Sequence, residues 1–501
     1  MSLTKVSYSM IEGAPINPLD LGAVGDGVAD DTAALNAALT SASSLRRPLA
    51  INGGTYKTTG PLNVSSNTTI VGAASATILY TNQNCGFKLD TVSNVSISGL
   101  VIDGQANTSY VVNTGNPFGI YINAGINIRI YDNEIKRCYR IGVSVGQTAS
   151  SNRVWIQNNF IHDIGYAADS IANYGNGVAV VFGSNIWIEN NHIANIYGTG
   201  AINIEPNTGS DDCSNIYILN NRIESTTSGA HGIQFYLAVL KVATFNNIII
   251  AENILSGVAG NAIRVNRSGN VKIVNNFAQD NLITVVNNNG SEALIDNNLC
   301  NKIAANGYGF NKVTNNTVTD SDAVGIYVED DGTTGAMTIV ANNFVKNPSS
   351  HGIQTRGRNF QITGNQIYSV GQGGAAYGIT ANGATLYALI DANSLTQITG
   401  TCTAFVSFQG TNFSETTYGT NMVLPTTVPL YDFFNSGDAK LFGVMTNGSA
   451  PDGGSCPFGT NVAWSVGNVI NKSNPISGGP PGFVCTTAGT PGTWKAMANL
   501  A

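Results

Sequence analysis

The sequence predicts an all-β solenoid in which short strands and tight turns wind into stacked parallel coils. A pattern of alternating apolar residues followed by asparagine recurs about ten times between residues 127 and 393, for example in 185–191 and 270–276. Alternation with a period of two is typical of strands, because successive side chains point to opposite faces. Asparagine suits the left-handed backbone of a sharp turn, and its amide can pair with the same amide one layer away. Units this short cannot bury their apolar face alone, so they must stack into a parallel β-helix.

Composition supports this class. Gly accounts for 57 of the 501 residues and charged residues for only 11%. A solenoid of this length grows along one axis and needs no division into several globules. The net charge of -7 argues against nucleic acid or an anionic membrane as partner. No apolar run approaches the roughly 20 residues of a membrane span, and the polar start at 1–10 is unlike a signal peptide.

The seven cysteines are scattered, without the close spacing of a metal site. We expect reduced thiols packed in the core, as is usual for small apolar side chains. Cys456 and Cys485 share one loop-rich segment and are the one pair open to a disulfide. No metal or other cofactor is expected.

Residues 1–49 form the predicted N-terminal segment. Gly25-Asp26-Gly27 indicates a tight turn, and Asp30 or Asp31 is the expected N-cap of a helix running to about Ala42. A metal site at these aspartates is the weaker interpretation. The helix would cover the open end of the solenoid, which otherwise exposes unpaired strand edges.

A family resemblance adds to this pattern. Residues 19–39 resemble the N-terminal signature of the pectate-lyase-like superfamily of right-handed, single-stranded parallel β-helices. Residues 6–14, which run into it, look like the start of bacteriophage tailspike depolymerases. The resemblance implies a homotrimer in the virion tail, held by other tail proteins, that acts on a bacterial capsular or lipopolysaccharide glycan. It leaves the reaction open, because the superfamily includes lyases, hydrolases, epimerases and non-catalytic members.

The coils are expected over residues 50–410. Their turn asparagines lie 18 to 32 residues apart, so some corners must accept inserted loops. These asparagines are Asn133, Asn159, Asn191, Asn221, Asn253, Asn276, Asn298, Asn316, Asn343, Asn365 and Asn393. The longest insertions fall between Asn133 and Asn253, which marks the expected binding region.

Residues 411–501 form a predicted C-terminal β-rich module. Its segment 446–501 is rich in Gly, Pro, Ser and Thr. A cap, a trimer contact and a glycan-binding appendage are all open roles. We expect Trp464 and Trp494 to pack in a small core rather than to stack on sugars.

A second recurring strand, Gly-Ile-x-Val-x, predicts which side chains face outward. Its Ile and Val positions are apolar in nearly every copy and should point inward, so the two x positions stack outside in columns about 4.8 Å apart. One column reads Asn203, Gln234, Arg264, and its neighbour reads Glu205, Tyr236, Asn266. Ala179 and Val181 precede these columns, and we expect the 162–174 loop to cover them.

These columns predict a polar groove for a sugar polymer. Glycoside hydrolysis needs two carboxylates, roughly 5–5.5 Å apart for retention and 6.5–9.5 Å for inversion. Glu205 is the candidate in the groove. Its partner should come from a loop, with Asp169 and Asp163 ranked ahead of Asp211 and Asp212. The plainer interpretation of Glu205 is a solvated strand residue.

A lyase would use other groups of the same face. Arg264 or Arg267 would neutralise a uronate carboxylate, with Tyr236 or His231 as base or acid. His231 and His351 both precede a Gly-Ile strand, however, and that parallel favours a structural role for both. For Glu329 and Arg356, which share a column further along, an ordinary cross-strand ion pair is expected.

Overall fold

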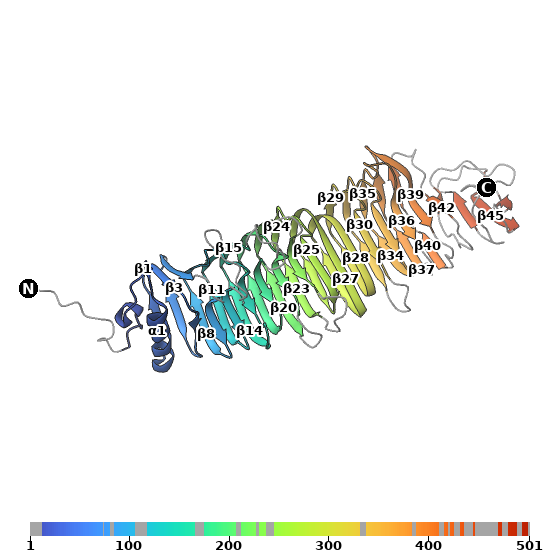
Figure 1. The fold of residues 1–501 in the computed structure, drawn as a ribbon. Coiled ribbons are helices and arrows are strands. Elements are labelled where there is room, and N and C mark those ends of the chain that lie inside the picture. The colour runs from blue at the N-terminus through green and yellow to red at the C-terminus, as the bar shows by residue number, and fades with distance from the viewer. Residues whose placement is uncertain are drawn as a thin grey trace, which may run out of the picture. The chain divides into compact units, whose positions relative to one another are not determined.

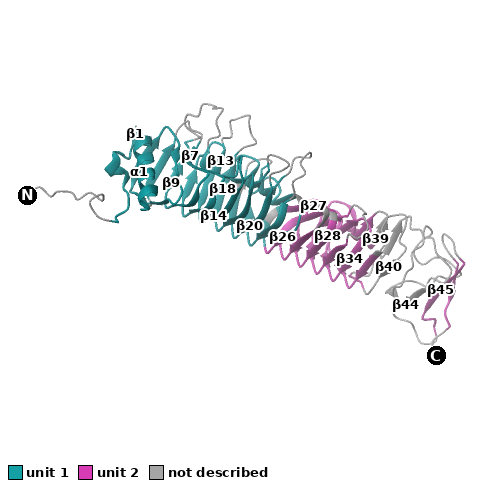
Figure 2. Cartoon of the chain, turned by 90° about the horizontal axis from the view of Figure 1, so that it is seen from below, with its two compact units in different colours: residues 1–271, 276–281 teal, residues 272–275, 282–501 magenta. Residues whose placement is uncertain are grey.

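The structure, a computed structural model, describes most of the chain. The described residues are 13–73, 75–80, 85–105, 118–165, 175–206, 212–226, 230–236, 245–330, 337–382, 387–409, 415–418, 421–424, 431–434, 444–445, 469–472, 479–487 and 493–498. Two compact units result, residues 1–271 with 276–281 and residues 272–275 with 282–501 (Figure 2). The predicted class, an all-β right-handed parallel β-helix with one N-terminal helix, is confirmed (Figure 1).

The first unit begins with the segment that carries the helix. Its elements are η2 Pro18–Leu21, β1 Asp26–Asp30, α1 Thr32–Leu45, β2 Leu49–Ile51, β3 Gly54–Thr58 and β4 Leu62–Asn63. Helix α1 packs against β2, β4 and η2, and it buries Leu35 and Leu39 as their spacing predicts.

The predicted capping role of the two aspartates needs a correction. Asp31 stands at the N-cap of α1, but its carboxylate makes no hydrogen bond to the helix. It is buried and accepts the backbone N–H groups of Val24 at 2.6 Å and Gly25 at 3.1 Å. Asp30 instead accepts the N–H and hydroxyl of Thr32, and these bonds lower the pKa of its carboxyl to about 2. Asp31 therefore fixes the turn before β1 rather than the helix.

Each coil of the first unit contributes one strand to each of three parallel sheets. The site sheet contains β7 Cys85–Asp90, β10 Phe118–Asn123, β13 Ile141–Val145, β16 Asn176–Val180, β19 Gly200–Ile204, β22 His231–Phe235 and β25 Ile263–Ser268. The aromatic sheet contains β5 Thr69–Gly72, β8 Ser93–Ser98, β11 Ile126–Tyr131, β14 Ser151–Gln157, β17 Gly183–Glu189, β20 Cys213–Leu219 and β23 Phe245–Ala251. The third sheet contains β6 Ala76–Tyr80, β9 Val101–Asp103, β12 Glu134–Lys136, β15 Phe160–Ile164, β18 His192–Ile196, β21 Arg222–Thr226 and β24 Ile254–Ser256.

The second unit repeats this plan. From the division between the units, the strands are β26 Val271–Val274, β27 Phe277–Asp296, β28 Leu299–Thr314, β29 Thr317–Thr319, β30 Ile326–Glu329, β31 Thr338–Ala341, β32 Phe344–Lys346, β33 Ile353–Arg356, β34 Asn359–Thr363, β35 Gln366–Tyr368, β36 Ala375–Asn382, β37 Tyr387–Asp391, β38 Ser394–Thr396, β39 Thr401–Gln409, β40 Glu415–Tyr418, β41 Met422–Leu424 and β42 Tyr431–Phe434. Parallel pairing between coils continues through β39–β42.

The turn asparagines divide two tasks between neighbouring residues. The residue before each ladder asparagine from Asn133 to Asn393 takes the left-handed backbone, for example Asn190 and Asn220 with φ of 56° and 54°. The following asparagine is buried, and its amide joins a ladder from coil to coil. Asn221 Oδ1 accepts the backbone and side-chain N–H groups of Asn191, both at 3.0 Å. Its own Nδ2 donates to Asn253 Oδ1 at 3.0 Å.

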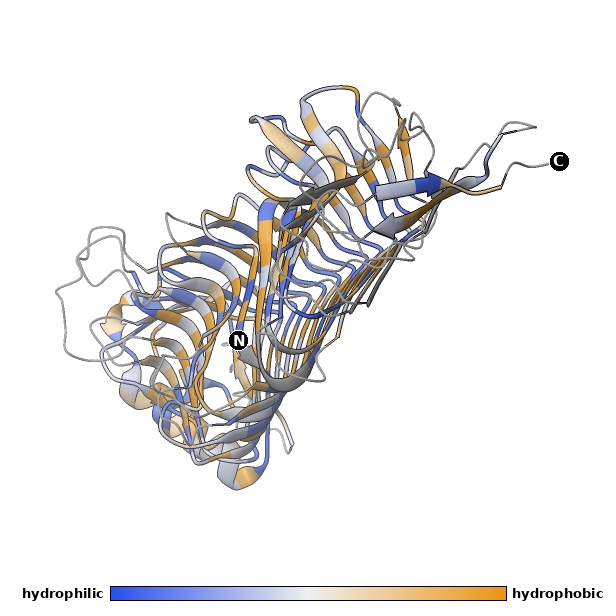
Figure 3. Cartoon of the chain, turned by 90° about the vertical axis from the view of Figure 1, so that its right-hand side faces the viewer, coloured by the Kyte–Doolittle hydropathy of each residue, from blue (hydrophilic) through white to orange (hydrophobic). Residues whose placement is uncertain are grey.

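The predicted amide ladder is thus confirmed in both units. In the first unit it joins Asn133, Asn159, Asn191, Asn221, Asn253 and Asn276. In the second it joins Asn298, Asn316, Asn343, Asn365, Asn393 and Asn421. Stacked Ile and Val side chains fill the interior beside it, and Figure 3 shows apolar residues recurring from coil to coil.

The glycines of the Gly-Ile strands are needed for close contact between coils. A Cβ on Gly142 would lie 2.6 Å from the carbonyl oxygen of Gly177, and one on Gly177 would lie 2.7 Å from that of Ala201. Real Cβ atoms do not approach so closely, so a side chain at Gly142 or Gly177 would force the neighbouring coil to shift. The outward side chains that follow are thereby held in register.

The aromatic sheet carries a column of stacked rings. Trp155 and Trp187 have centroids 4.9 Å apart, and Tyr217 continues the stack 5.4 Å beyond Trp187. The Arg129 guanidinium lies 5.0 Å from the Trp155 ring centroid. Because the rings cover one another's faces, they stabilise the sheet and leave only their edges to solvent.

The C-terminal residues form a separate four-stranded sheet. It contains β43 Val444–Met445, β44 Val469–Lys472, β45 Gly482–Thr487 and β46 Thr493–Ala496. Trp494 is buried, as predicted, whereas Trp464 lies outside the described residues. Cys485 is a buried free thiol, whereas Cys456 lies outside the described residues. The buried thiols Cys85, Cys138, Cys213 and Cys300 confirm the expected reduced core residues.

Candidate functional site

The strand register confirms the predicted outward columns. Asn203 pairs with Gln234, and Gln234 pairs with Arg264, across β19, β22 and β25. Glu205 and Tyr236 directly follow β19 and β22, and both are half-buried. Neighbouring inward residues such as Ile204 and Phe235 are completely buried. The site sheet therefore presents a carboxylate, a phenol and a guanidinium on one outer face.

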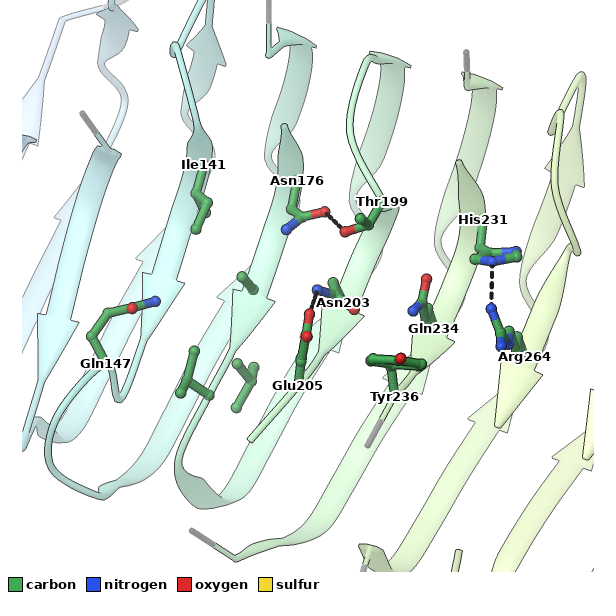
Figure 4. A pocket seen from close by; sticks show the side chains of 13 residues that line it. Ile141, Gln147, Asn176, Thr199, Asn203, Glu205, His231, Gln234, Tyr236 and Arg264 are labelled. Carbon is green, nitrogen blue, oxygen red and sulfur yellow. Dashed lines mark hydrogen bonds between the residues drawn. The ribbon is translucent and has the colours of Figure 1, made fainter. Parts of the chain in front are cut away.

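These side chains line a cavity of about 540 Å³ in the first unit (Figure 4). That volume is within the range of small-molecule binding sites. Its polar wall contains Asn203, Glu205, His231, Gln234, Tyr236 and Arg264. Six of the residues predicted from sequence thus meet in one place.

Apolar side chains line much of the opposite end of the cavity, where Gln147 also lies (Figure 4). Ala179 and Val181 line it, together with Ile141 on the preceding strand. All three side chains are 6% exposed or less. Ala179 stands in the same column as Asn203, so one column changes from apolar to polar within a single coil step. The covering role expected of the 162–174 loop falls largely on residues outside the described ones.

Two buried amide oxygens in the polar wall have no hydrogen-bond partner among the described residues. They are Asn203 Oδ1 and Gln234 Oε1, on side chains 3% and 5% exposed. Asn203 Nδ2, in contrast, donates to Glu205 Oε2 at 3.0 Å, which orients the carboxylate (Figure 4). A buried acceptor without a partner costs about 1–3 kcal/mol. A ligand that supplies hydroxyl donors would recover this energy.

His231 has one fixed orientation. The backbone N–H of Asn261 donates to its Nδ1 at 2.9 Å, so the proton of the neutral ring is on Nε2. Burial and the nearby Arg264 lower the pKa of His231 to about 4. His351 accepts from Tyr377 in the same way, at 3.0 Å, and burial lowers its pKa. Both histidines thus accept a backbone N–H group, which is compatible with the expected structural role, and His231 additionally lines the cavity.

This lowered pKa has a consequence for stability. An unfolded histidine titrates near 6.5, so between about pH 6.5 and 4 the unfolded chain binds a proton that the folded chain does not. We expect the free energy of unfolding to fall as pH decreases through this window. His231→Gln, which keeps an acceptor for Asn261, should show a smaller fall in thermal midpoint between these pH values. An unchanged slope would contradict the assignment.

The other predicted residues lie in different places. Asp163 is on the third sheet, not in the cavity; its carboxylate contacts His162 Nδ1 at 2.8 Å and accepts from Asn195 at 3.0 Å. Asn266 is half-buried and is not among the lining residues. The Arg267 side chain, Asp169 and Asp211 lie outside the described residues. Asp212 is exposed and lines no part of the cavity.

Sequence reasoning missed part of the rim. Asn176 and Ile141 pair in register at the position before the recurring glycine, which also holds His231. The Asn176 side chain accepts from the Thr199 hydroxyl at 2.9 Å and from the Gly200 N–H at 3.0 Å. Strict alternation does not place this column outside. The shared position before each Gly-Ile pair was the available signal.

In the second unit, the expected pair between Glu329 and Arg356 is confirmed at 3.4 Å. The Tyr327 hydroxyl donates to the same carboxylate at 2.6 Å, and burial together with Glu329 raises the pKa of Tyr327 to about 12. These three groups satisfy one another, unlike those of the cavity.

The chain is similar in sequence to one protein family and to two curated proteins. Residues 16–93 match the family described as rhamnogalacturonase A/epimerase, pectate lyase-like. The chain is 26% identical over 223 residues to a glucan 1,3-beta-glucosidase of Cochliobolus carbonum, covering 37% of this chain and 28% of that protein. It is 28% identical over 261 residues to mannuronan C5-epimerase AlgE2 of Azotobacter vinelandii, covering 44% and 26%. The chain thus spans about a quarter of the length of these curated relatives.

Among solved structures, the N-terminal fragment of bacteriophage Phi29 gene product 12 has a TM-score of 0.48 at 15% identity, covering 81% of this chain and 91% of that one. A family 28 exopolygalacturonase of Yersinia enterocolitica has a TM-score of 0.43 at 15% identity, covering 85% and 78%. The family match alone places the pectate-lyase-like signature in the N-terminal part of the chain, at residues 16–93. No helix within the described residues is both long and apolar enough to cross a membrane.

Proposed function

We propose that this chain binds and depolymerises a bacterial surface polysaccharide. The observation that carries the proposal is the cavity, where two buried amide oxygens lack partners beside a carboxylate, a phenol and a guanidinium. Sugar hydroxyls are the donors such oxygens need. The curated relatives with names for carbohydrate enzymes, a glucosidase and an epimerase, support the same substrate class.

The favoured reaction is glycoside hydrolysis with Glu205 as one of two carboxylates. Among the described lining residues Glu205 is the one carboxylate, so its partner must come from another segment. Asp169 and Asp211 remain candidates for that partner. The Asn203 side chain donates to Glu205 Oε2 at 3.0 Å and so orients the carboxylate that would act as nucleophile or base.

A lyase reaction is the second candidate, and Arg264 is the observation that favours it. A guanidinium in the cavity would stabilise the charge that develops when a proton is removed beside a uronate carboxylate. Tyr236, whose ring centroid lies 5.6 Å from the Arg264 guanidinium carbon, would act as base or acid. His231 does not fit the role of base, because Nδ1 is occupied and Nε2 carries the proton.

The biological setting is also proposed. The resemblance of residues 6–39 to tailspike depolymerases supports a homotrimer in a virion tail, joined to other tail proteins and facing a capsular or lipopolysaccharide glycan. A spike that binds this glycan without cleaving it is the alternative. Such a spike would lose affinity on Tyr236→Ala while leaving polymer length unchanged.

One experiment separates these functions. The purified chain is incubated with capsular and O-antigen polysaccharides, and new reducing ends and the ultraviolet absorbance of unsaturated uronate are followed together. Hydrolysis produces reducing ends without absorbance, whereas elimination produces both. Binding without either product indicates the non-catalytic spike. If the chain neither binds nor shortens any of these glycans, the proposal is refuted.

A further inference from the structure

Arg264 has no carboxylate partner among the described residues, unlike Arg137 and Arg222 of the first unit. Arg137 contacts Asp103 and Arg222 contacts Glu224. No ion pair among the described residues includes Arg264, although its side chain is half-buried. A partly desolvated guanidinium without an anion is unfavourable. Its cationic face rests on the Tyr236 ring instead.

In the contact between Arg264 and His231, both side chains present hydrogen-bond donors to each other. Arg264 Nη1 lies 3.1 Å from His231 Nε2 (Figure 4). The Asn261 N–H occupies the ring's one free lone pair, at Nδ1, so Nε2 presents N–H toward a guanidinium that also only donates. Neither group satisfies the other. An anionic oxygen between them would accept from both.

The other polar side chains of the cavity wall lack hydrogen-bond donors rather than acceptors. Asn203 Oδ1 and Gln234 Oε1 offer unpaired acceptors, and the Glu205 carboxylate adds a negative charge. Glu205 and Arg264 are two coils apart, which corresponds to roughly 10 Å along the sheet. Along the cavity wall, the acceptors near Glu205 thus give way to the donors of Arg264 and His231 over more than one coil.

We propose that the cavity selects an acidic sugar residue, whose anionic group is held between Arg264 and His231 Nε2–H while its hydroxyls donate to Asn203 and Gln234. The carbohydrate nature of the ligand rests on the function proposed above. The shared chemistry is an anionic oxygen, supplied by a carboxylate or by a sulfate or phosphate ester. The acidic group lies about two coils from Glu205, so it orients the polymer along the site sheet.

The test measures binding rather than cleavage. Glucuronate and galacturonate are titrated into the full chain by calorimetry or ligand-observed NMR beside glucose and galactose. Glucose 6-sulfate and glucose 6-phosphate form the second arm, which distinguishes an ester from a carboxylate. We expect at least one anionic class to bind tenfold or more tighter than the neutral sugars, with Arg264→Gln removing the preference.

Matched variants make the result specific. Arg222→Gln removes the same charge from an arginine outside the cavity and should keep the preference. Arg264→Lys, which retains the charge, should keep part of it, and circular dichroism checks that each variant is folded. Equal affinity for neutral and anionic sugars, no binding of any anionic probe, or a preference that survives Arg264→Gln would overturn the proposal. Because these probes require no cleavage, a failed depolymerisation assay does not affect this outcome.

Discussion

Replacing Glu205 with glutamine should reduce depolymerisation by at least about 100-fold, the typical contribution of a positioned acid, base or nucleophile group. Glutamine keeps the size of the side chain and removes the charge that the reaction needs. The side chain faces the cavity and not the core, so the thermal midpoint should stay nearly unchanged. Reducing ends released per unit time from the cleaved glycan are the measurement.

Two further variants define what this result means. Glu189→Gln makes the same chemical change on the aromatic sheet, away from the cavity, and should leave activity intact. A polar residue at Ile204, which is completely buried next to Glu205, should damage the fold through burial of an unsatisfied group. If Glu205→Gln retains full activity, or unfolds the chain, Glu205 does not have the proposed role.

Replacing Asn221 with alanine should destabilise the first unit by about 3–5 kcal/mol, the largest stability effect we expect from a single polar side chain. The substitution removes the acceptor of the Asn191 backbone and side-chain N–H groups, and one of the two residue-221 donors to Asn253 Oδ1. It also removes a bond of 2.8 Å to the carbonyl oxygen of Ile188. Chemical unfolding followed by circular dichroism measures the loss.

The neighbouring residue supplies a matched control. Asn220 is exposed, and its φ of 54° is one that glycine adopts readily. Asn220→Gly should therefore change stability by less than about 1 kcal/mol. Equal losses from the two variants would show that the turn, and not the amide ladder, stabilises the coils.

The fold was predictable because one sequence pattern repeats. Each copy must bury its apolar face and pair its turn amide with the next coil. The spacing of Asn191, Asn221 and Asn253 indicated both the coil and its amide contacts. Residues 299–313 do not show the Gly-Ile-x-Val-x pattern clearly, and the structure gives the reason. Strand β28 runs without interruption and pairs in turn with β29, β30 and β31. The turn residues that divide the other coils are missing from that stretch.

The site was predictable only where it lies on regular strands. The columns of Asn203 and Glu205 followed from alternation, because register fixes which side chains are neighbours. Asp163 was chosen for its proximity in sequence to a long insertion, yet β15 directs it to the third sheet. Loop geometry is not encoded in a repeating pattern, so a partner carboxylate cannot be located by counting residues.

The inner amide ladder stabilises the coils, whereas the outer columns line the cavity. This separation has an evolutionary consequence. Exchanges at Asn203, Gln234 or Arg264 alter what the surface recognises without touching the Asn221 ladder, since the two sets share no hydrogen bond. Such a scaffold can change its target in small steps while remaining foldable at every step.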